Sequence, residues 1–280
     1  MEVVAVILAC LSGAAVALGL LRRSDGRAEQ AERARLVATQ PRDPARFSPD
    51  MLVPLPEPAR RFFGFAIRPG TPLLTVADIS MTGRFGMGGK AKPAYRQMRA
   101  RQVLAAPDGF VWAMATQGGL PLSGSDTGRW TRFRILGLIP VARRGGDADH
   151  ARAAFGRMIA EAVFWTPAAL LPGPGVTWEA VDDDTARVTV SRGGLSQAVD
   201  VRVDAEGRPL MVWFQRWSDA NPERRYRLQP FGGYLSDFRE VAGFRLPHRV
   251  EAGNMFGTED WFPFFLAEVT AIAFPEGGAP

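Results

Sequence analysis

Hydrophobic residues are most concentrated at the start of the chain. Val3 to Leu21 is a run of nineteen positions without a charged side chain. At about 1.5 Å per residue, a helix of this length matches a hydrocarbon core of roughly 30 Å. The first positive charges, Arg22 and Arg23, follow the run, whereas a cleaved signal peptide carries positive charge before its apolar stretch. The pattern predicts an uncleaved, single-pass transmembrane helix over residues 1–22.

A lipoprotein signal is an alternative interpretation of this run, because Ile7-Leu8-Ala9-Cys10 is similar to the lipobox that precedes a lipidated cysteine. No basic residue precedes it, and the apolar run continues for eleven residues beyond Cys10. A small thiol packed in a membrane helix therefore fits the pattern better than lipidation.

Residues 23–54 form an arginine-rich juxtamembrane linker. Seven arginines and four acidic residues lie between Arg22 and Arg46, which gives this part +3 of the total charge of +5. Helix-favouring residues extend to Thr39, before two prolines end the pattern. The mixed charge favours a solvated linker over a segment that binds anionic headgroups. By the positive-inside rule, the arginines hold the following domain on the cytoplasmic side of the inner membrane; the extracytoplasmic side is the alternative, since large domains can be translocated despite flanking charges.

After residue 55 the spacing of the hydrophobic positions changes. A short helix is predicted where Pro56-Glu57-Pro58 precedes Phe62 and Phe63, and Pro69-Gly70 ends it. Beyond it, stretches with strand-like composition are separated by clusters of Gly, Pro and Asp. The strand-like stretches lie at residues 73–85, 95–104, 110–115, 131–135, 187–190, 199–203, 209–217, 225–238, 244–251 and 261–274.

One of these stretches shows strict alternation. Thr131, Phe133 and Ile135 face one side, and Arg132 and Arg134 face the other. This alternation is typical of an antiparallel strand with its polar face in solvent.

A helix over residues 151–165 interrupts the strands, with Asp147 and Asp149 at its positive end. Its apolar positions recur at helical spacing: Phe155, Met158, Ile159, Ala162 and Val163. Short strands joined by hairpins, with helices inserted midway, predict an α+β fold over residues 55–275. We expect a strongly curved antiparallel sheet, or half-barrel, with helices packed on one face, because a long sheet closes into a barrel or is capped by its helices. Residues 276–280 are a tail.

Several segments resemble an uncharacterised bacterial DUF-type family, and the resemblance covers roughly residues 55–274. In that family a hydrophobic N-terminal segment precedes a domain similar in outline to the LolA/LolB half-barrels, which hold acyl chains in a cup of sheet and helices. The resemblance implies this architecture and supplies no catalytic residues, because the family has no established activity. It is carried by Leu55-Pro56-Glu57-Pro58-Ala59-Arg60-Arg61-Phe62-Phe63, Gly109-Phe110-Val111-Trp112, the stretch from Trp178 to Ala186, the stretch from Phe231 to Glu240, and Gly243-Phe244-Arg245-Leu246-Pro247.

Composition excludes several kinds of chemistry. With one cysteine and two histidines, the chain has no internal disulfide, and we expect no metal site. Gly86-Met87-Gly88-Gly89-Lys90-Ala91 matches a dinucleotide-binding string, but a strand-like stretch follows where such a site needs a helix. The acidic cluster Asp182-Asp183-Asp184 lacks the ligand spacing of a calcium loop. We therefore expect no cofactor.

Catalysis is the least favoured of three hypotheses, and the sequence assigns no catalytic residues. A hydrolase or isomerase would have to use Glu161, His248 or Asp237, and these groups would have to converge in one pocket. His248, in a strand-like stretch, is better explained as a structural hydrogen-bonding group. Nucleic-acid binding is also disfavoured, because the arginines are dispersed and often adjoin acidic residues.

The aromatic residues carry the leading hypothesis, a membrane protein that binds a lipid or another hydrophobic molecule in its cup. For each of these residues, filling a core is the simpler role. The alternative is a membrane-associated module that binds a protein partner without a ligand, through an apolar stretch longer than alternation requires. The expected partners are thus the bilayer, through the N-terminal helix, and a hydrophobic small molecule. The candidate ligand-binding residues are Trp112, Trp130, Phe133, Trp165, Trp178 and Trp213, and the candidate surface residues are Trp261, Phe262, Phe264 and Phe265.

Overall fold

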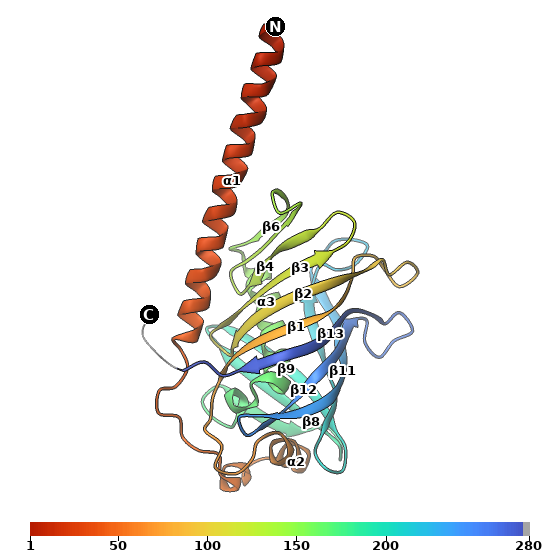
Figure 1. Ribbon diagram of the computed structural model, residues 1–280. Helices are drawn as coiled ribbons and strands as arrows, with labels where there is room; N and C mark the ends of the chain where they lie inside the picture. Colours follow the sequence, from red (N-terminus) through yellow and green to blue (C-terminus); the bar gives the residue numbers. More distant parts are fainter. Residues whose placement is uncertain (277–280) are drawn as a thin grey trace.

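The computed structural model describes residues 1–276, and it begins with one long helix, α1 (Glu2–Val37). The first half of α1 projects from the domain as a straight rod (Figure 1). Its apolar side chains are exposed, and α1 is long and apolar enough to cross a membrane, as predicted. No second helix in residues 1–276 has this property.

The second half of α1 is helical, as its composition indicated, but it packs on the outer face of the sheet instead of forming a solvated linker. Leu36 is completely buried beside Val103 and Val111. Asp25 and Glu32, seven residues apart on α1, are also buried. The basic segment therefore belongs to the folded domain, since its acidic residues meet arginines that come much later in the chain.

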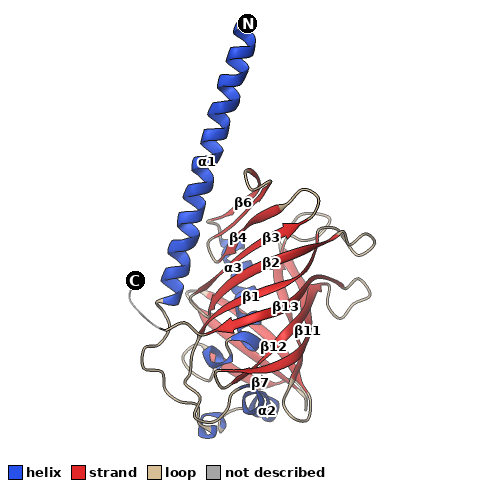
Figure 2. Ribbon diagram, in the orientation of Figure 1, coloured by secondary structure: helices blue, strands red, loops and turns tan. Residues whose placement is uncertain are grey.

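Thirteen antiparallel strands form a single curved sheet that is not closed (Figure 2). The predicted α+β half-barrel is confirmed. Apart from α1, the helical elements are η1 (Pro49–Leu52), α2 (Glu57–Ala66), α3 (Ala148–Trp165) and η2 (Pro167–Leu170). The strands are β1 (Val76–Gly86), β2 (Tyr95–Ala105), β3 (Gly109–Gln117), β4 (Leu122–Thr127), β5 (Trp130–Ile135), β6 (Ile139–Gly145), β7 (Val176–Ala180), β8 (Thr185–Arg192), β9 (Leu195–Val203), β10 (Pro209–Ser218), β11 (Arg227–Val241), β12 (Phe244–Asn254) and β13 (Phe262–Ala273).

The strand order explains why the helices lie inside the cup. Strands β1 to β6 run outward from the middle of the sheet to one edge, and β7 to β13 run back from the other edge to pair with β1. The chain between the two edges contains α3 and η2. Helix α3 contacts strands of both halves, namely β2, β3, β6, β9, β10 and β12. It therefore fills much of the concave side of the open sheet.

Sequence dictates the local structure of α3. The Asp147 carboxylate caps the helix by accepting a hydrogen bond from the backbone N–H of His150, at 2.7 Å. The five apolar positions predicted to share a face are all buried. Burial of such a face supplies most of the stability of a helix in a protein.

Helix α2 lies at the end of the domain opposite the protruding part of α1 (Figure 1). Phe62 and Phe63 are fully buried and pack on Trp178, with ring centroids 5.8 and 5.3 Å away. Arg61 binds the backbone carbonyl of Asp183 in the β7–β8 turn. The predicted helix at this position is confirmed, and it covers this end of the cup.

The polar face predicted for β5 is not in solvent. Arg134 is only 7% exposed, because α1 covers the outer face of β5 and places Asp25 against it. Phe133, on the other face, points inward as predicted and lines the concave side. The alternation along β5 was thus predicted correctly, but the face that was expected in solvent is buried between α1 and the sheet.

Candidate functional site

A cavity of about 340 Å³ lies between α3 and the concave face of the sheet. This volume falls within the range of roughly 300 to 1,000 Å³ that is typical of small-molecule sites. Side chains from α3 and from both halves of the sheet line it, so the cavity exists only in the assembled half-barrel. The aromatic lining residues are Phe85, Trp112 and Phe133 from the first half, Phe164 and Trp165 from α3, and Phe214, Phe231, Phe264 and Phe265 from the second half.

Five of these rings form a continuous band along the wall. The ring centroids are 5.6 Å apart for Phe214 and Phe231, 6.0 Å for Phe231 and Phe264, 5.6 Å for Phe264 and Phe85, and 6.1 Å for Phe85 and Trp112. These separations lie within the range of favourable aromatic pairs. This part of the wall is therefore apolar.

A polar cluster occupies one part of the cavity wall. The Arg157 guanidinium on α3 lies 2.8 Å from an Asp126 carboxylate oxygen and 2.7 Å from one of Glu161. It also lies over the rings of Phe110 and Trp112, 4.8 and 4.9 Å from their centroids. Burial lowers the pKa of Arg157, but attraction to Glu161 and Asp126 outweighs this effect and raises the pKa above its ordinary value.

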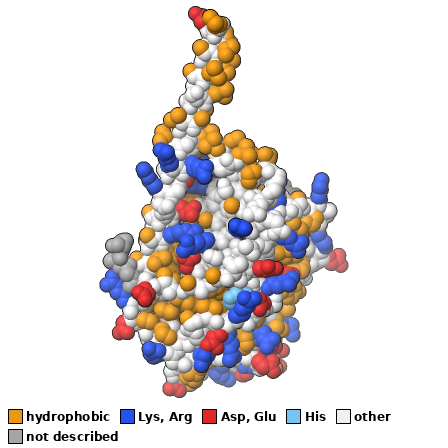
Figure 3. Space-filling model, viewed as in Figure 1, with side chains coloured by type: hydrophobic (Ala, Val, Ile, Leu, Met, Phe, Trp, Pro, Cys, Tyr) orange, Lys and Arg blue, Asp and Glu red, His pale blue; other side chains and the backbone are white. Residues whose placement is uncertain are grey.

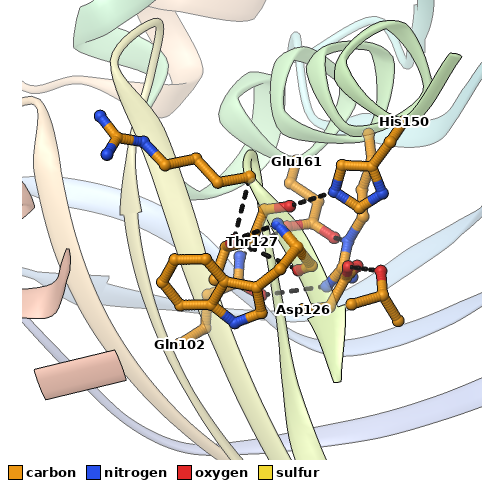
Figure 4. Close-up of polar contacts among 9 residues, drawn as sticks. Gln102, Asp126, Thr127, His150 and Glu161 are labelled. Carbon is orange, nitrogen blue, oxygen red and sulfur yellow. Dashed lines mark hydrogen bonds and ion pairs between the residues drawn. The ribbon is translucent and has the colours of Figure 1, made fainter. Parts of the chain in front are cut away.

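Neighbouring polar side chains satisfy the two carboxylates further. Gln102 donates a hydrogen bond to Glu161, and Thr131 donates one to Asp126. Figure 4 shows Gln102, Asp126 and Glu161 gathered beside α3. Close by, the His150 ring contacts the backbone carbonyl of Thr127 through Nε2, at 3.1 Å.

Arg216, on β10, is the second arginine that lines the cavity. Its guanidinium lies over the Phe231 ring, 4.7 Å from the centroid, and its Nε atom is buried without a hydrogen-bond partner among residues 1–276. Burial, and then repulsion by Arg157, lower the pKa of Arg216 to about 10. The side chain therefore still carries its positive charge at neutral pH.

Three of the six candidate ligand-binding residues line the cavity, namely Trp112, Phe133 and Trp165. The other three do not. Trp130 stacks on Arg132, and Trp178 packs on α2 and donates a hydrogen bond to Leu170. Trp213 stacks on Phe256, in the β12–β13 loop.

The four candidate surface residues also separate into two groups. Phe264 and Phe265 line the cavity, whereas Trp261 packs edge-on against Tyr234 and Phe262 packs on Tyr95. All four are partly buried. The stretch therefore contributes two residues to the cavity rather than a single continuous surface.

The candidate catalytic groups do not gather in the cavity. Glu161 lines it, but Asp237 lies in a separate surface hollow and pairs with Arg239 at 2.6 Å. His248 is buried, and its Nδ1 lies 3.1 Å from the backbone carbonyl of Leu246, as expected for a structural histidine. Within residues 1–276, no group of three His, Cys, Asp or Glu side chains is placed to hold a metal ion.

Sequence reasoning missed the two cavity arginines. The alternation Val212, Phe214, Arg216 along β10 was a usable signal, because it places Arg216 on the same face as two cavity residues. For Arg157 the helical spacing was also a usable signal, because it lies four positions before Glu161 and seven before Phe164 on α3. Its partners Asp126 and Gln102 come from distant strands.

Among solved structures, the chain is similar to a LolA superfamily protein from Nitrosomonas europaea, with 12% identity and a TM-score of 0.41 over 77% of this chain and 90% of that one. It is also similar to a domain from Vibrio parahaemolyticus described as an outer membrane lipoprotein-sorting protein, with 11% identity and a TM-score of 0.38 over 82% of this chain and 92% of that one. No curated protein matches the sequence. Residues 45–266 match the model of DUF6544, a family of unknown function. The match covers most of the chain and confirms the resemblance to a DUF-type family: the chain belongs to the DUF6544 family.

Proposed function

We propose that this protein is a membrane-anchored binding protein that holds a lipid or another hydrophobic molecule in the cavity of its half-barrel. The observation that carries this proposal is the aromatic-lined cavity of about 340 Å³ between α3 and the sheet. Protein interiors are packed densely, with few voids larger than a water molecule. If the aromatic side chains served only as core, they would fill this space. A cavity of this size and composition instead suits an apolar ligand.

The anchor is part of the same proposal. The exposed apolar half of α1 spans the inner membrane, and Arg22 and Arg23 lie at its cytoplasmic surface by the positive-inside rule. The domain then lies on the cytoplasmic side. Because the second half of α1 packs on the sheet, the cavity is held close to the bilayer rather than on a free tether.

The cavity can be tested with a dibrominated long-chain alcohol, since bromine quenches tryptophan fluorescence on contact. We expect saturable quenching of the full chain held in an amphipathic polymer, because Trp112 and Trp165 line the cavity. The Trp112→Phe variant should lose a large share of the quenched amplitude. The matched Trp217→Phe variant should keep it, because Trp217 stacks on Tyr226 and is not a cavity residue. Quenching that does not saturate, or that both variants retain equally, would contradict the proposed site.

A further inference from the structure

The charged groups that line the cavity do not pair one to one. Two guanidinium groups, of Arg157 and Arg216, and two carboxylates, of Asp126 and Glu161, face it. Arg157 binds both carboxylates directly. No carboxylate within residues 1–276 forms an ion pair with Arg216, and its Nε has no acceptor there. Arg216 is therefore the one charged group of the wall without a direct ion-pair partner in residues 1–276, although Asp126 and Glu161 attract it from a longer distance.

A second hydrogen-bond donor in the wall also lacks an acceptor. The Nε1 of Trp112 is buried, and no group in residues 1–276 accepts a hydrogen bond from it. The carboxylate acceptors nearby are engaged by Arg157, Gln102 and Thr131. Buried donors without partners cost free energy, and a buried charge without a partner costs more. No acceptor in residues 1–276 therefore reaches the Trp112 Nε1 or the Arg216 Nε, and no carboxylate there contacts the Arg216 guanidinium directly.

We propose that the cavity selects amphiphiles with an anionic head group, a carboxylate or a phosphate, and that Arg216 binds the head group while the aromatic band holds the chain. This inference rests on the proposed function and specifies its ligand class. A guanidinium presents a planar fork of donors that matches two oxygens of a carboxylate or phosphate. An uncharged head group would leave Arg216 without a direct ion pair.

The test compares three brominated probes that share one chain: dibrominated stearate, the corresponding alcohol, and lysophosphatidic acid with that chain. We expect the wild-type full chain to bind at least one acidic probe about 10- to 100-fold more tightly than the alcohol, the range for a hydrogen bond to a charged group. The tighter of the two acidic probes tells a fatty acid from a phosphate head group. In Arg216→Met the preference for the acid should fall to about one, while alcohol binding persists and shows that the cavity is folded. Arg227→Met, which removes an exposed arginine of the adjacent strand β11, should keep the preference.

The outcomes distinguish the two proposals. A wild-type chain that binds acid and alcohol equally, or an Arg216→Met variant that keeps the preference, overturns the head-group site and leaves the hydrophobic cavity in place. A wild-type chain that binds none of the three probes overturns the proposed function itself. A second readout is the melting temperature of Arg216→Met without ligand, which should not fall, because the substitution removes a desolvated charge that makes no direct ion pair within residues 1–276.

A different set of observations concerns the side of the domain beside α1. The tips of the β3–β4 and β5–β6 hairpins carry exposed apolar side chains, with Leu120 55% and Leu136 56% exposed. The backbone N–H of Leu136 donates a hydrogen bond to the carbonyl of Pro121, so the two tips are held together. The Arg22 guanidinium lies beside Gly137 at the β5–β6 tip. Figure 3 shows hydrophobic side chains along this edge of the domain, at the base of the protruding helix.

We infer that these two hairpin tips contact the bilayer surface. Arg22 directly follows the apolar run of α1, so it lies where a spanning helix leaves the hydrocarbon and its charge meets the headgroups. The tips lie at the same level. Exposed apolar side chains at that depth would be buried in the interface, as in amphipathic surface anchors.

An environment-sensitive dye on a single cysteine can test this contact in vesicles of mixed zwitterionic and anionic lipids. Cys10 is the only cysteine, so Leu136→Cys is made in a Cys10→Ser background. We expect blue-shifted emission and quenching by spin-labelled lipid for the dye at 136. The matched control is Val181→Cys, which is 47% exposed in the β7–β8 turn beside α2 and should report water.

Dye on Cys10 of the otherwise unchanged chain should report the bilayer interior. If the dye at 136 behaves like the dye at 181 while Cys10 reports the interior, the hairpin contact is wrong and the anchor stands. If the dye on Cys10 reports water, the anchor is wrong and the contact falls with it.

Discussion

A chain with asparagine in place of Asp25 is expected to lose about 3 kcal/mol of unfolding free energy and to release the second half of α1 from the sheet. Asp25 is the single acidic partner, within residues 1–276, of Arg132, Arg134 and Arg143. Burial, and then repulsion by Arg143 and Arg22, lower the pKa of Arg134. The cluster of three arginines and Asp25 therefore carries a net positive charge. Removal of the Asp25 carboxylate leaves the three arginines without an acidic partner among residues 1–276.

The magnitude follows from the exposure of the partners. Breaking a buried ion pair on one side costs about 3 to 5 kcal/mol, because a desolvated charge is left behind. The lower end applies here, since the side chains of Arg132 and Arg143 are 24% and 37% exposed and keep part of their hydration.

Urea unfolding of the full chain in mild detergent would measure this effect. Glu223→Gln is the control, because it removes a carboxylate from an exposed pair with Arg227. Such pairs contribute at most about 1 kcal/mol. Equal midpoints for the two variants would show that the Asp25 cluster does not hold α1 on the domain.

Arg157→Met is expected to have a comparable or larger effect, about 3 to 5 kcal/mol, because it strands two carboxylates in the cavity wall. The side chains of Asp126 and Glu161 are 18% and 15% exposed. Gln102 and Thr131 would still donate hydrogen bonds to them, but neither residue carries a charge. Helix α3 should consequently separate from the first half of the sheet.

Thermal unfolding of Arg157→Met and Arg216→Met gives a direct contrast within one cavity. The first variant is expected to melt at a lower temperature than wild type, and the second is not. A lower melting temperature for Arg157→Met identifies Arg157 as a structural residue. An unchanged or higher melting temperature for Arg216→Met is expected of a residue that serves ligand binding rather than stability. If Arg157→Met is as stable as wild type, the ion cluster does not hold α3 in place.

The elements that were predicted correctly are those with strong local signals. The capping aspartate and the five apolar positions of α3 specified that helix, and Pro56-Glu57-Pro58 before Phe62 and Phe63 specified α2. Strand β4 had no such signal, because Leu-Ser-Gly-Ser-Asp-Thr contains neither valine nor isoleucine. It is a strand because β3 and β5 pair with it on both sides.

Long-range pairing explains the remaining differences. Asp25 and Arg132 are 107 positions apart in sequence, so charge pattern alone suggested a solvated linker and a solvated strand face. The same holds for the cavity. Aromatic content indicated an apolar site, but only the fold shows that Trp112 lines it, that Trp213 does not, and that Arg216 makes no direct ion pair among residues 1–276.

The most direct test of the central claim, that the half-barrel holds a hydrophobic ligand, is native mass spectrometry of the full chain isolated from its own membranes. The wild-type protein is expected to carry one extra mass that organic extraction identifies as an amphiphile. Ala160→Trp, which fills the cavity from α3, should lose that mass. Ala151→Trp, half a turn of the helical wheel away on the same helix, should keep it. A wild-type protein without bound amphiphile, or equal occupancy in all three chains, would contradict the claim.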